Sequence, residues 1–396
     1  IKENWKPALT VALVAFPLNV ALSIASGVGP IPGIITGIWA GFIAALFGGS
    51  NYNVIGTAGA LTTLLAAFAL TQINGIGTGV ILLPLVAICS GLLILLVYAL
   101  RLEKYLIYIP SSVMYGFASG VAVLIALNQL PDAFGIVLVS HLHFFDKVKD
   151  LIAHIHELHI PTFSVFLASF LFLFLWSKKI KRIPAVIPLT LLGVLVGWIS
   201  SQSFIAGFDI TTLSQRYPLD AKLVQLISFE TWKSVLSFDI LLVILRASSV
   251  IALVCVLETL ITAKLADKIT HTHHDSRKEL FGLGLGNLAS GFAGGLPATG
   301  VFVRTGLNVK SGATHKSSAA MAALFGACIA LLFLPVLAFL PMSVIAAMLC
   351  MTAIRLIEKH GFARLWKEDK KNFVVALFVA AITLFEDASI GILVGI

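Results

Sequence analysis

The sequence has 396 residues, of which 59% are hydrophobic and only 12% are charged. Soluble domains carry roughly 25% charged residues, so this composition excludes an ordinary soluble protein and predicts an all-α polytopic membrane protein in a lipid bilayer. The formal net charge is +8, but the basic residues are scattered through short loops. The positive-inside rule explains them better than binding to nucleic acid does.

Apolar runs long enough to cross a membrane recur along the whole chain. Fourteen transmembrane segments are predicted: residues 7–26, 32–47, 48–70, 79–100, 109–130, 161–176, 184–199, 248–267, 280–292, 294–310, 318–339, 341–354, 372–384 and 389–396. With the amino terminus in the cytoplasm, most of the 27 Lys and Arg residues fall on the inner side.

Two long loops interrupt this pattern. Residues 200–238 are predicted to be a loop with a short surface helix. Residues 131–160 include a stretch with helical apolar spacing, which predicts an amphipathic helix on the membrane surface. Its five histidines could instead bind metal or sense pH: His141, His143, His154, His156 and His159.

Two of the fourteen segments cannot form continuous helices. Residues 48–70 begin with a polar, β-like stretch and become helical near Thr57 and Ala58. Residues 294–310 carry Gly, Pro and the membrane-embedded Arg304, and Gly and Pro interrupt a spanning helix. Each segment is therefore predicted to be a short extended stretch followed by a half-helix.

A weak internal repeat relates the two halves. ALVAF at 12–16 recurs as ALVCV at 252–256, and Gly48-Gly49 recurs as Gly294-Gly295. Because seven segments per half is an odd number, the halves are predicted to run in opposite directions across the membrane. A 7+7 inverted repeat with broken helices at matching positions indicates a transport site at the bilayer midplane.

The two half-helices would point their amino ends at each other, and each end offers unpaired N–H groups and partial positive charge. This arrangement predicts an anion site. Arg304 would touch the anion, support the field from behind, or form a structural pair with Glu258. The other predicted site residues are mostly small or apolar: Leu18, Leu22, Thr57, Ala58, Val301, Phe302 and Val303.

Glu258 lies in the middle of the eighth segment, and Thr262 follows one turn later on the same helix face. A carboxyl group in a low dielectric favours its neutral form, so Glu258 could carry a coupling proton. Alternatively, Glu258 and Thr262 could coordinate Na⁺. The sequence shows no nucleophile–base set, metal-ligand cluster or phosphate-binding loop, so we expect neither an enzyme nor a cofactor.

Several stretches resemble the SulP family of anion transporters, which includes the prestin and pendrin group and a cyanobacterial bicarbonate transporter. They are VAFPLNVALSIASGV, FIAALFGGSNYNVIGTAGALTTL, IPSSVMYGFASG and ETLITAKLADKITHTHHDSRKELFGLGLGNLASGFAGGLPATGVFVRT. The resemblance implies a uracil-permease-like fold, with a core domain (1–100 and 239–340), a gate domain (101–238 and 341–396), elevator movement and a homodimer. It places the family's anion-site positions at Leu18, Leu22, Ala58, Phe302, Val303 and Arg304, and its Na⁺ positions at Glu258 and Thr262.

The chain departs from the family pattern at two positions and in one domain. The bicarbonate member lacks a half-helix arginine, whereas Arg304 is present here, and Thr57 stands where a proline is common. No part of the sequence matches the family's cytoplasmic STAS domain.

We expect a proton-coupled secondary transporter of small anions such as bicarbonate, sulfate, chloride or a small dicarboxylate. Its location would be the cell membrane, which in a bacterium is the inner membrane. Alternatives are a Na⁺-coupled bicarbonate symporter, an anion exchanger, a nucleobase–proton symporter and, in another class, an anion channel or a voltage-responsive motor.

Overall fold

The computed structural model describes residues 3–73, 77–104, 110–138, 144–180, 183–202, 207–219, 222–226, 237–357, 359–386, 390–391 and 394. The chain divides into two compact units. The first comprises Ile1–Ile107 and Asp220–Phe333, and the second comprises Tyr108–Leu219 and Leu334–Ile396. Each unit therefore combines segments from both halves of the chain. The roles of core and gate remain predictions.

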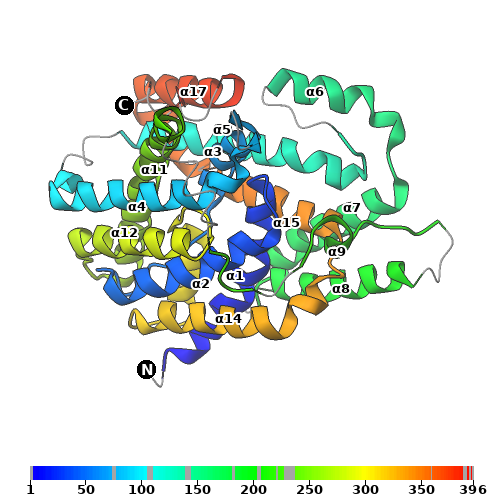
Figure 1. Cartoon of the computed structure of the whole chain (residues 1–396), viewed down its shortest axis with the longest axis horizontal. Coiled ribbons are helices and arrows are strands. Elements are labelled where there is room, and N and C mark those ends of the chain that lie inside the picture. The colour runs from blue at the N-terminus through cyan, green and yellow to red at the C-terminus, as the bar shows by residue number, and fades with distance from the viewer. Residues whose placement is uncertain are drawn as a thin grey trace. The chain divides into compact units, whose positions relative to one another are not determined.

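The first unit is built mainly from helices (Figure 1). Its elements are α1 (Trp5–Ala25), α2 (Pro30–Phe47), β1 (Ile55–Gly56), α3 (Gly59–Leu70), β2 (Gln72–Ile73), β3 (Gly77–Thr78), η1 (Gly79–Leu82), α4 (Leu83–Ala99), η2 (Leu102–Lys104), α11 (Phe238–Thr270), α12 (Ser276–Phe292), β4 (Thr299–Gly300), α13 (Phe302–Lys310) and most of α14 (Ser317–Leu337). The strands form two short antiparallel ladders, β1 with β4 and β2 with β3.

The second unit is also helical. It contains the end of α14 together with α5 (Ser111–Phe134), α6 (Phe144–Ala153), η4 (Ile155–Glu157), α7 (Ile160–Lys179), α8 (Val186–Ser201), α9 (Leu213–Arg216), α15 (Met342–Leu356), α16 (Lys359–Glu368) and α17 (Lys370–Phe385). Most residues of helix α15 are buried, and the helix packs against α5 and α7.

Seven helices in the described residues are long and apolar enough to cross a membrane: Trp5–Ala25, Pro30–Phe47, Gly79–Ala99, Ser112–Phe134, Ile160–Lys179, Phe238–Thr270 and Ser317–Leu337. Two shorter apolar helices are Gly59–Leu70 and Val186–Ser201. The predicted mostly helical fold is confirmed. The count of fourteen spans and the inverted repeat remain predictions, and the last predicted segment, 389–396, falls largely outside the described residues.

Helix boundaries differ from the prediction where polar residues begin a helix. Helix α11 starts at Phe238 rather than near residue 248, with an acidic first turn that suits the helix dipole. Helix α12 starts at Ser276 rather than near 280, because the Asp275 side chain accepts the backbone N–H of Lys278. Helix α16 was not predicted; none of its residues is buried, so it lacks the apolar signal of a span.

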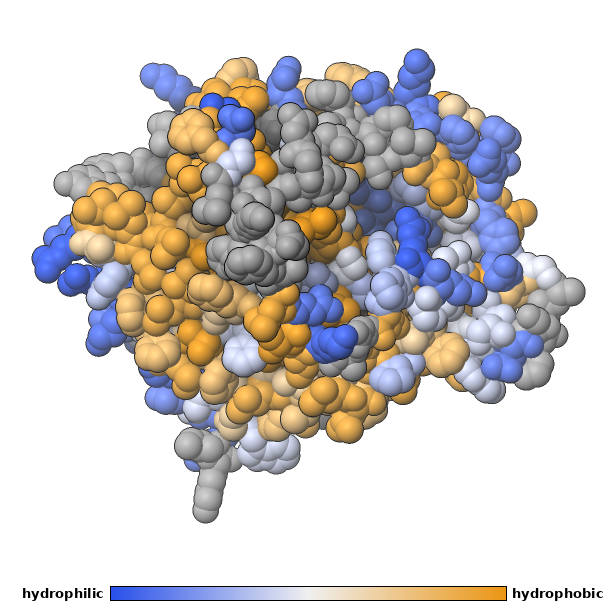
Figure 2. All heavy atoms as spheres, in the orientation of Figure 1, coloured by the Kyte–Doolittle hydropathy of each residue, from blue (hydrophilic) through white to orange (hydrophobic). Residues whose placement is uncertain are grey.

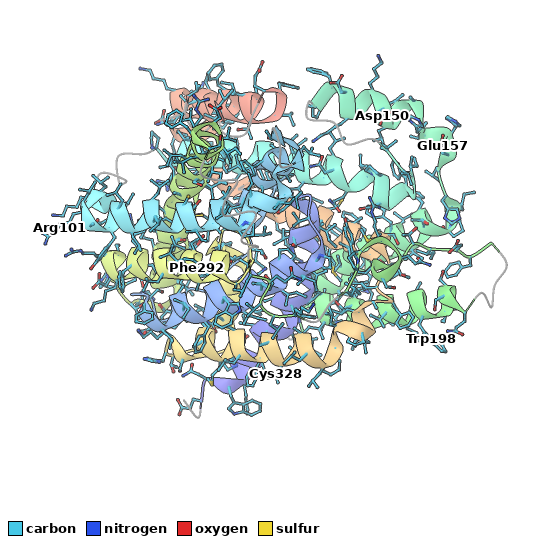
Figure 3. All side chains as sticks on the ribbon, viewed as in Figure 1. Arg101, Asp150, Glu157, Trp198, Phe292 and Cys328 are labelled. Atoms are coloured by element: carbon cyan, nitrogen blue, oxygen red, sulfur yellow. The ribbon has the colours of Figure 1, made fainter. Side chains whose placement is uncertain are left out.

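The core of the first unit lies where α12 packs against α2 and α4, as Figure 1 shows. Glycine allows this close approach, since a Cβ on Gly284 would lie 2.7 Å from Cγ of Leu95. On the outside, apolar side chains gather over α4, α12 and α14, where Figure 2 is mainly orange. Phe292, which Figure 3 labels at the end of α12, is exposed, and Leu332 on α14 is exposed as well. Such a surface suits contact with lipid.

Residues 131–160, where an amphipathic helix was predicted, contain helix α6, and its position on a membrane surface remains a prediction. Phe145 and Ile152 of α6 are exposed, and His154 follows the helix beside Asp150, which Figure 3 labels. His141 and His143 lie outside the described residues. In the part of the chain that the structure describes, no group of three His, Cys, Asp or Glu side chains could hold a metal ion.

Candidate functional site

The two broken segments meet through their extended stretches. Strand β1 pairs antiparallel with β4, with Ile55 opposite Gly300 and Gly56 opposite Thr299. The backbone N–H of Val301 also donates to the carbonyl of Val54 at 3.0 Å. The sequence predicted an extended stretch before each half-helix, and the structure has one at both places. It also shows that the two stretches hydrogen-bond to each other.

Both half-helices begin without a side-chain cap. The residue before α3 is Ala58 and the residue before α13 is Val301; both have extended backbones and neither makes a side-chain hydrogen bond to its helix. Alanine and valine carry no acceptor, so the first-turn N–H groups of both helices lack the side-chain partner that a Ser, Thr, Asn or Asp would provide. These groups are therefore suited to bind an anion.

Threonines of α11 hold β4 in place. The hydroxyl of Thr259 accepts the backbone N–H of Gly300 at 2.9 Å, and the hydroxyl of Thr262 donates to the Gly300 carbonyl at 3.3 Å. The hydroxyl of Thr299 donates to the carbonyl of Cys255 at 3.0 Å. The extended stretch is thus anchored to the helix that carries Glu258.

Helix α12 anchors the first broken segment. The carboxylate of Glu279 accepts the backbone N–H groups of Gly49 and Ser50, each at 2.8 Å, and the side-chain amide of Asn53 at 2.7 Å. Asn287 holds the second segment in a similar way, because its side chain bonds to both the N–H and the carbonyl of Ala298. One helix therefore supports both broken segments.

Asn53 and Thr305 tie the two segments directly to each other. The hydroxyl of Thr305 donates to Oδ1 of Asn53 at 3.0 Å and accepts the backbone N–H of Val54 at 3.0 Å. All of these polar groups are buried. Burying a polar group without a hydrogen-bond partner costs free energy, so this network favours one arrangement of the two half-helices.

Arg304 is only 1% exposed, and its side chain extends into the interior of the first unit. Nη2 donates to the hydroxyl of Thr57 at 3.3 Å, and that hydroxyl donates to Oδ1 of Asn19 at 2.7 Å. Among the described residues, no carboxylate forms an ion pair with Arg304, so the structural pair with Glu258 is absent. Arg304 borders a cavity of about 30 Å³ between α1, α2, β1 and α14, with room for roughly one or two waters.

Glu258 lies on α11, the helix to which strand β4 is hydrogen-bonded. Its Oε2 atom is buried and has no hydrogen-bond partner among the described residues. Thr262, the other predicted coupling-ion residue, is one helical turn away and bonds to Gly300. A carboxyl group with an unsatisfied oxygen at this position could accept a proton or a small cation.

The remaining predicted site residues fall into two groups. Leu18, Leu22, Thr57 and Ala58 are buried, and the hydroxyl of Thr57 bonds within the protein interior. Phe302 and Val303, at the start of α13, are 43% and 37% exposed, and Val301 is partly exposed. Arg304 thus lies on a different face of α13 from Phe302 and Val303.

Sequence reasoning missed most of the polar residues that build the site. They are Asn19, Asn53, Thr259, Glu279, Asn287, Thr299 and Thr305. One signal was available, because polar side chains are rare within otherwise apolar spans and indicate a partner or a functional role.

Residues 3–379 match the sulfate permease family. The putative sulfate transporter YvdB of Bacillus subtilis is 28% identical over 98% of this chain and 71% of its own length. The chloroplastic sulfate transporter 4.1 of Arabidopsis thaliana is also 28% identical, and this chain spans 57% of its length. The bicarbonate transporter BicA of Picosynechococcus is 25% identical over 98% of this chain and 67% of its length.

Two solved structures share the fold. The transmembrane domain of a cyanobacterium bicarbonate transporter, BicA, superposes with a TM-score of 0.86 and 24% identity, covering 99% of this chain and 97% of that one. The overall structure of SLC26A9 superposes with a TM-score of 0.82 and 15% identity, covering 100% of this chain and 64% of that one. Since the family match extends over nearly all of its residues, the chain belongs to the sulfate permease family.

Proposed function

We propose that this chain is a secondary active transporter of small anions, with sulfate, bicarbonate, chloride and small dicarboxylates as candidate substrates. The observation that carries the proposal is the pairing of two uncapped half-helix starts beside an arginine that has no carboxylate partner among the described residues. Partial positive charge and unpaired N–H groups converge there in an apolar setting. The names of the relatives, sulfate and bicarbonate transporters, support this substrate class.

The position of Arg304 supports one of the two anion-related roles predicted for it. Its side chain bonds inward to Thr57, whereas Phe302 and Val303 occupy the exposed face of the half-helix. Arg304 would therefore strengthen the positive field from behind the N–H groups rather than contact the anion. Leu18, Leu22, Ala58 and Val301 would form the apolar lining of the site.

The transport mechanism is proposed as elevator-type alternating access in a homodimer, with fourteen spans in two inverted halves and the amino terminus in the cytoplasm. The first unit would act as the core domain and the second as the gate domain. The antiparallel pairing of β1 with β4 supports inversion, because equivalent stretches of the two halves run in opposite directions. The chain would reside in the cell membrane, the inner membrane in a bacterium.

Glu258 is the proposed site of proton coupling. The buried, unpartnered Oε2 atom can take a proton without breaking an existing hydrogen bond. A second candidate is Na⁺ coupling, favoured by the oxygen atoms of Thr262 and Gly300 on the same side of α11. Sodium prefers oxygen ligands of this kind, as other hard cations do.

Uptake of labelled anions into proteoliposomes tests the proposal. Sulfate and bicarbonate would be assayed with imposed pH or Na⁺ gradients. We expect Arg304→Ala to abolish uptake and the exposed control Arg364→Ala to retain it. Wild-type uptake by Arg304→Ala would refute the site.

The same assay tests the coupling ion. Glu258→Gln should remove the stimulation by an inward proton gradient, with the exposed Glu368→Gln as its control. Stimulation by Na⁺ alone, lost in Glu258→Gln, would select sodium coupling. Flux far above carrier turnover would instead indicate the alternative class, an anion channel, and gating-charge movement would indicate a voltage-responsive motor.

A further inference from the structure

Asn19 is a polar residue in the middle of α1, and it is only 6% exposed. The surrounding residues of α1 are almost all apolar, so its side chain needs an internal partner. Its Oδ1 atom accepts the hydroxyl of Thr57 at 2.7 Å. The residue therefore reaches from α1 to the start of the first half-helix.

The glycines of α2 make room for this side chain. A Cβ added to Gly37 would clash with Nδ2 of Asn19, and a Cβ added to Gly33 would clash with the Asn19 backbone carbonyl. Glycine at both positions lets α2 pack directly against Asn19. The carboxamide is consequently fixed in one place by close packing as well as by its hydrogen bond.

Asn19, Thr57 and Arg304 form a directed chain of hydrogen bonds. The guanidinium donates from Nη2 to Thr57 Oγ1 at 3.3 Å, and the only hydroxyl hydrogen of Thr57 is donated on to Asn19 Oδ1. Because that hydrogen is committed to Asn19, the oxygen of Thr57 turns its lone pairs toward Arg304. Asn19 thus orients the acceptor that holds the guanidinium.

The last acceptor in this series of hydrogen bonds is the carboxamide of Asn19, which is neutral. An amide oxygen can orient the guanidinium without neutralising its charge, whereas a carboxylate at the same place would pair with it. Gly56 lets the guanidinium lie against β1, since a Cβ there would be 2.6 Å from Nη1. The positive charge is therefore held close to the paired strands and to both half-helix starts.

We propose that Asn19 is a positioning residue for transport, which fixes Arg304 through Thr57 with a neutral acceptor and so leaves its charge available to the transported anion. This inference rests on the proposed function of the site. It explains why a polar side chain is present in α1 at the point where α2 provides two glycines.

The isosteric substitution Asn19→Asp tests whether the acceptor at position 19 must be neutral. The new carboxylate occupies the same space, pairs with Arg304 through Thr57 and opposes the entering anion. We expect the KM for uptake into proteoliposomes to rise at least about ten-fold, equivalent to about 1.4 kcal/mol of lost anion affinity. The thermal unfolding temperature should not fall. A wild-type KM in a folded Asn19→Asp variant overturns the proposal.

A neutral substitution of similar size tests whether Asn19 positions Arg304 through Thr57. Asn19→Leu keeps the shape but removes the acceptor of the Thr57 hydroxyl, so we expect a smaller rise in KM, about three-fold or more, which corresponds to roughly 0.7 kcal/mol. An unchanged KM in Asn19→Leu also overturns the proposal, and this variant carries no new charge that could impair folding.

Asn4→Asp is the matched control. Asn4 is also buried and lies just before the same helix, where it bonds to Thr314 rather than to Arg304. We expect its KM to match the wild type. Arg304→Ala distinguishes a failure of the proposed function from a failure of the role proposed for Asn19. If Arg304→Ala transports normally, the proposed function fails; if it is inactive while Asn19→Asp keeps a wild-type KM, only the role of Asn19 fails.

Discussion

The carboxylate of Glu279, at the start of α12, accepts the backbone N–H of Ser50 at 2.8 Å. A single acidic side chain thereby holds the beginning of the first broken segment. The N–H of Gly49 and the side chain of Asn53 donate to the same carboxylate, so three donors depend on one residue. The arrangement of the candidate site accordingly depends on contacts made well outside the two half-helices.

Replacing Glu279 by Gln should destabilise the first unit. A carboxamide has one acceptor oxygen, and its NH₂ group would face either the backbone N–H groups or the Asn53 amide, which leaves a buried donor unpaired. We expect a loss of about 1–3 kcal/mol in stability, measured as a lower thermal unfolding temperature in detergent. Glu157→Gln, on an exposed side chain, should leave that temperature unchanged. Equal temperatures for both variants would contradict the anchoring role.

Thr259→Val should weaken the attachment of β4 to α11. Valine has the shape of threonine but cannot accept the N–H of Gly300, which then remains buried without its partner. The expected loss of stability is again about 1–3 kcal/mol, accompanied by slower anion uptake. Thr190→Val is a suitable comparison, because the Thr190 hydroxyl donates to the carbonyl of Val186 in its own helix, α8. Retention of full uptake in Thr259→Val would mean that the strand keeps its place without this bond.

Gly56→Ala should displace the guanidinium of Arg304, because the new Cβ would lie 2.6 Å from Nη1. We expect a KM for anion uptake raised by about ten-fold or more, the change that corresponds to roughly 1.4 kcal/mol. Gly326→Ala is the counterpart in α14: Gly326 lines the same cavity as Arg304, but in the described part of the chain nothing outside its own helical turn lies within 4 Å of the added Cβ. Its KM should stay at the wild-type value. If the two variants behave alike, the close approach at Gly56 has no functional consequence.

Asp275 should contribute stability that depends on pH. The backbone N–H of Lys278 lowers the pKa of this capping carboxyl below its ordinary value. A group whose pKa is lower in the folded state stabilises it above the unfolded pKa of about 3.9, and this contribution is lost as pH falls through the folded value.

The capping contribution of Asp275 can be measured directly. We expect Asp275→Ala to cost about 1 kcal/mol at neutral pH, and Asp275→Asn to cost only a few tenths because Asn is also a good cap. Unfolding temperatures measured from pH 7 downward should converge for wild type and Asp275→Ala in acid. A constant difference at every pH would show that ionisation of Asp275 is irrelevant.

Local patterns in the sequence were sufficient for the coarse architecture. Apolar runs predicted most of the long apolar helices, the polar start of 48–70 predicted the first break, and Gly and Pro in 294–310 predicted the second. These signals depend only on residues that are close together in the sequence, so they can be recognised without knowledge of the fold. The charged residues Arg304 and Glu258 were also identifiable, because single charges in apolar spans are costly.

Hydrogen-bond partners that are far apart in the sequence could not be predicted from these local patterns. Thr305 and Val54 are 251 positions apart, and Asn53 and Glu279 are 226 apart, yet they form hydrogen bonds. Sequence alone left Arg304 with three possible roles, among them a pair with Glu258. Tertiary packing decided that its guanidinium turns toward Thr57 and Asn19, since only the folded chain shows which buried acceptor lies within its reach.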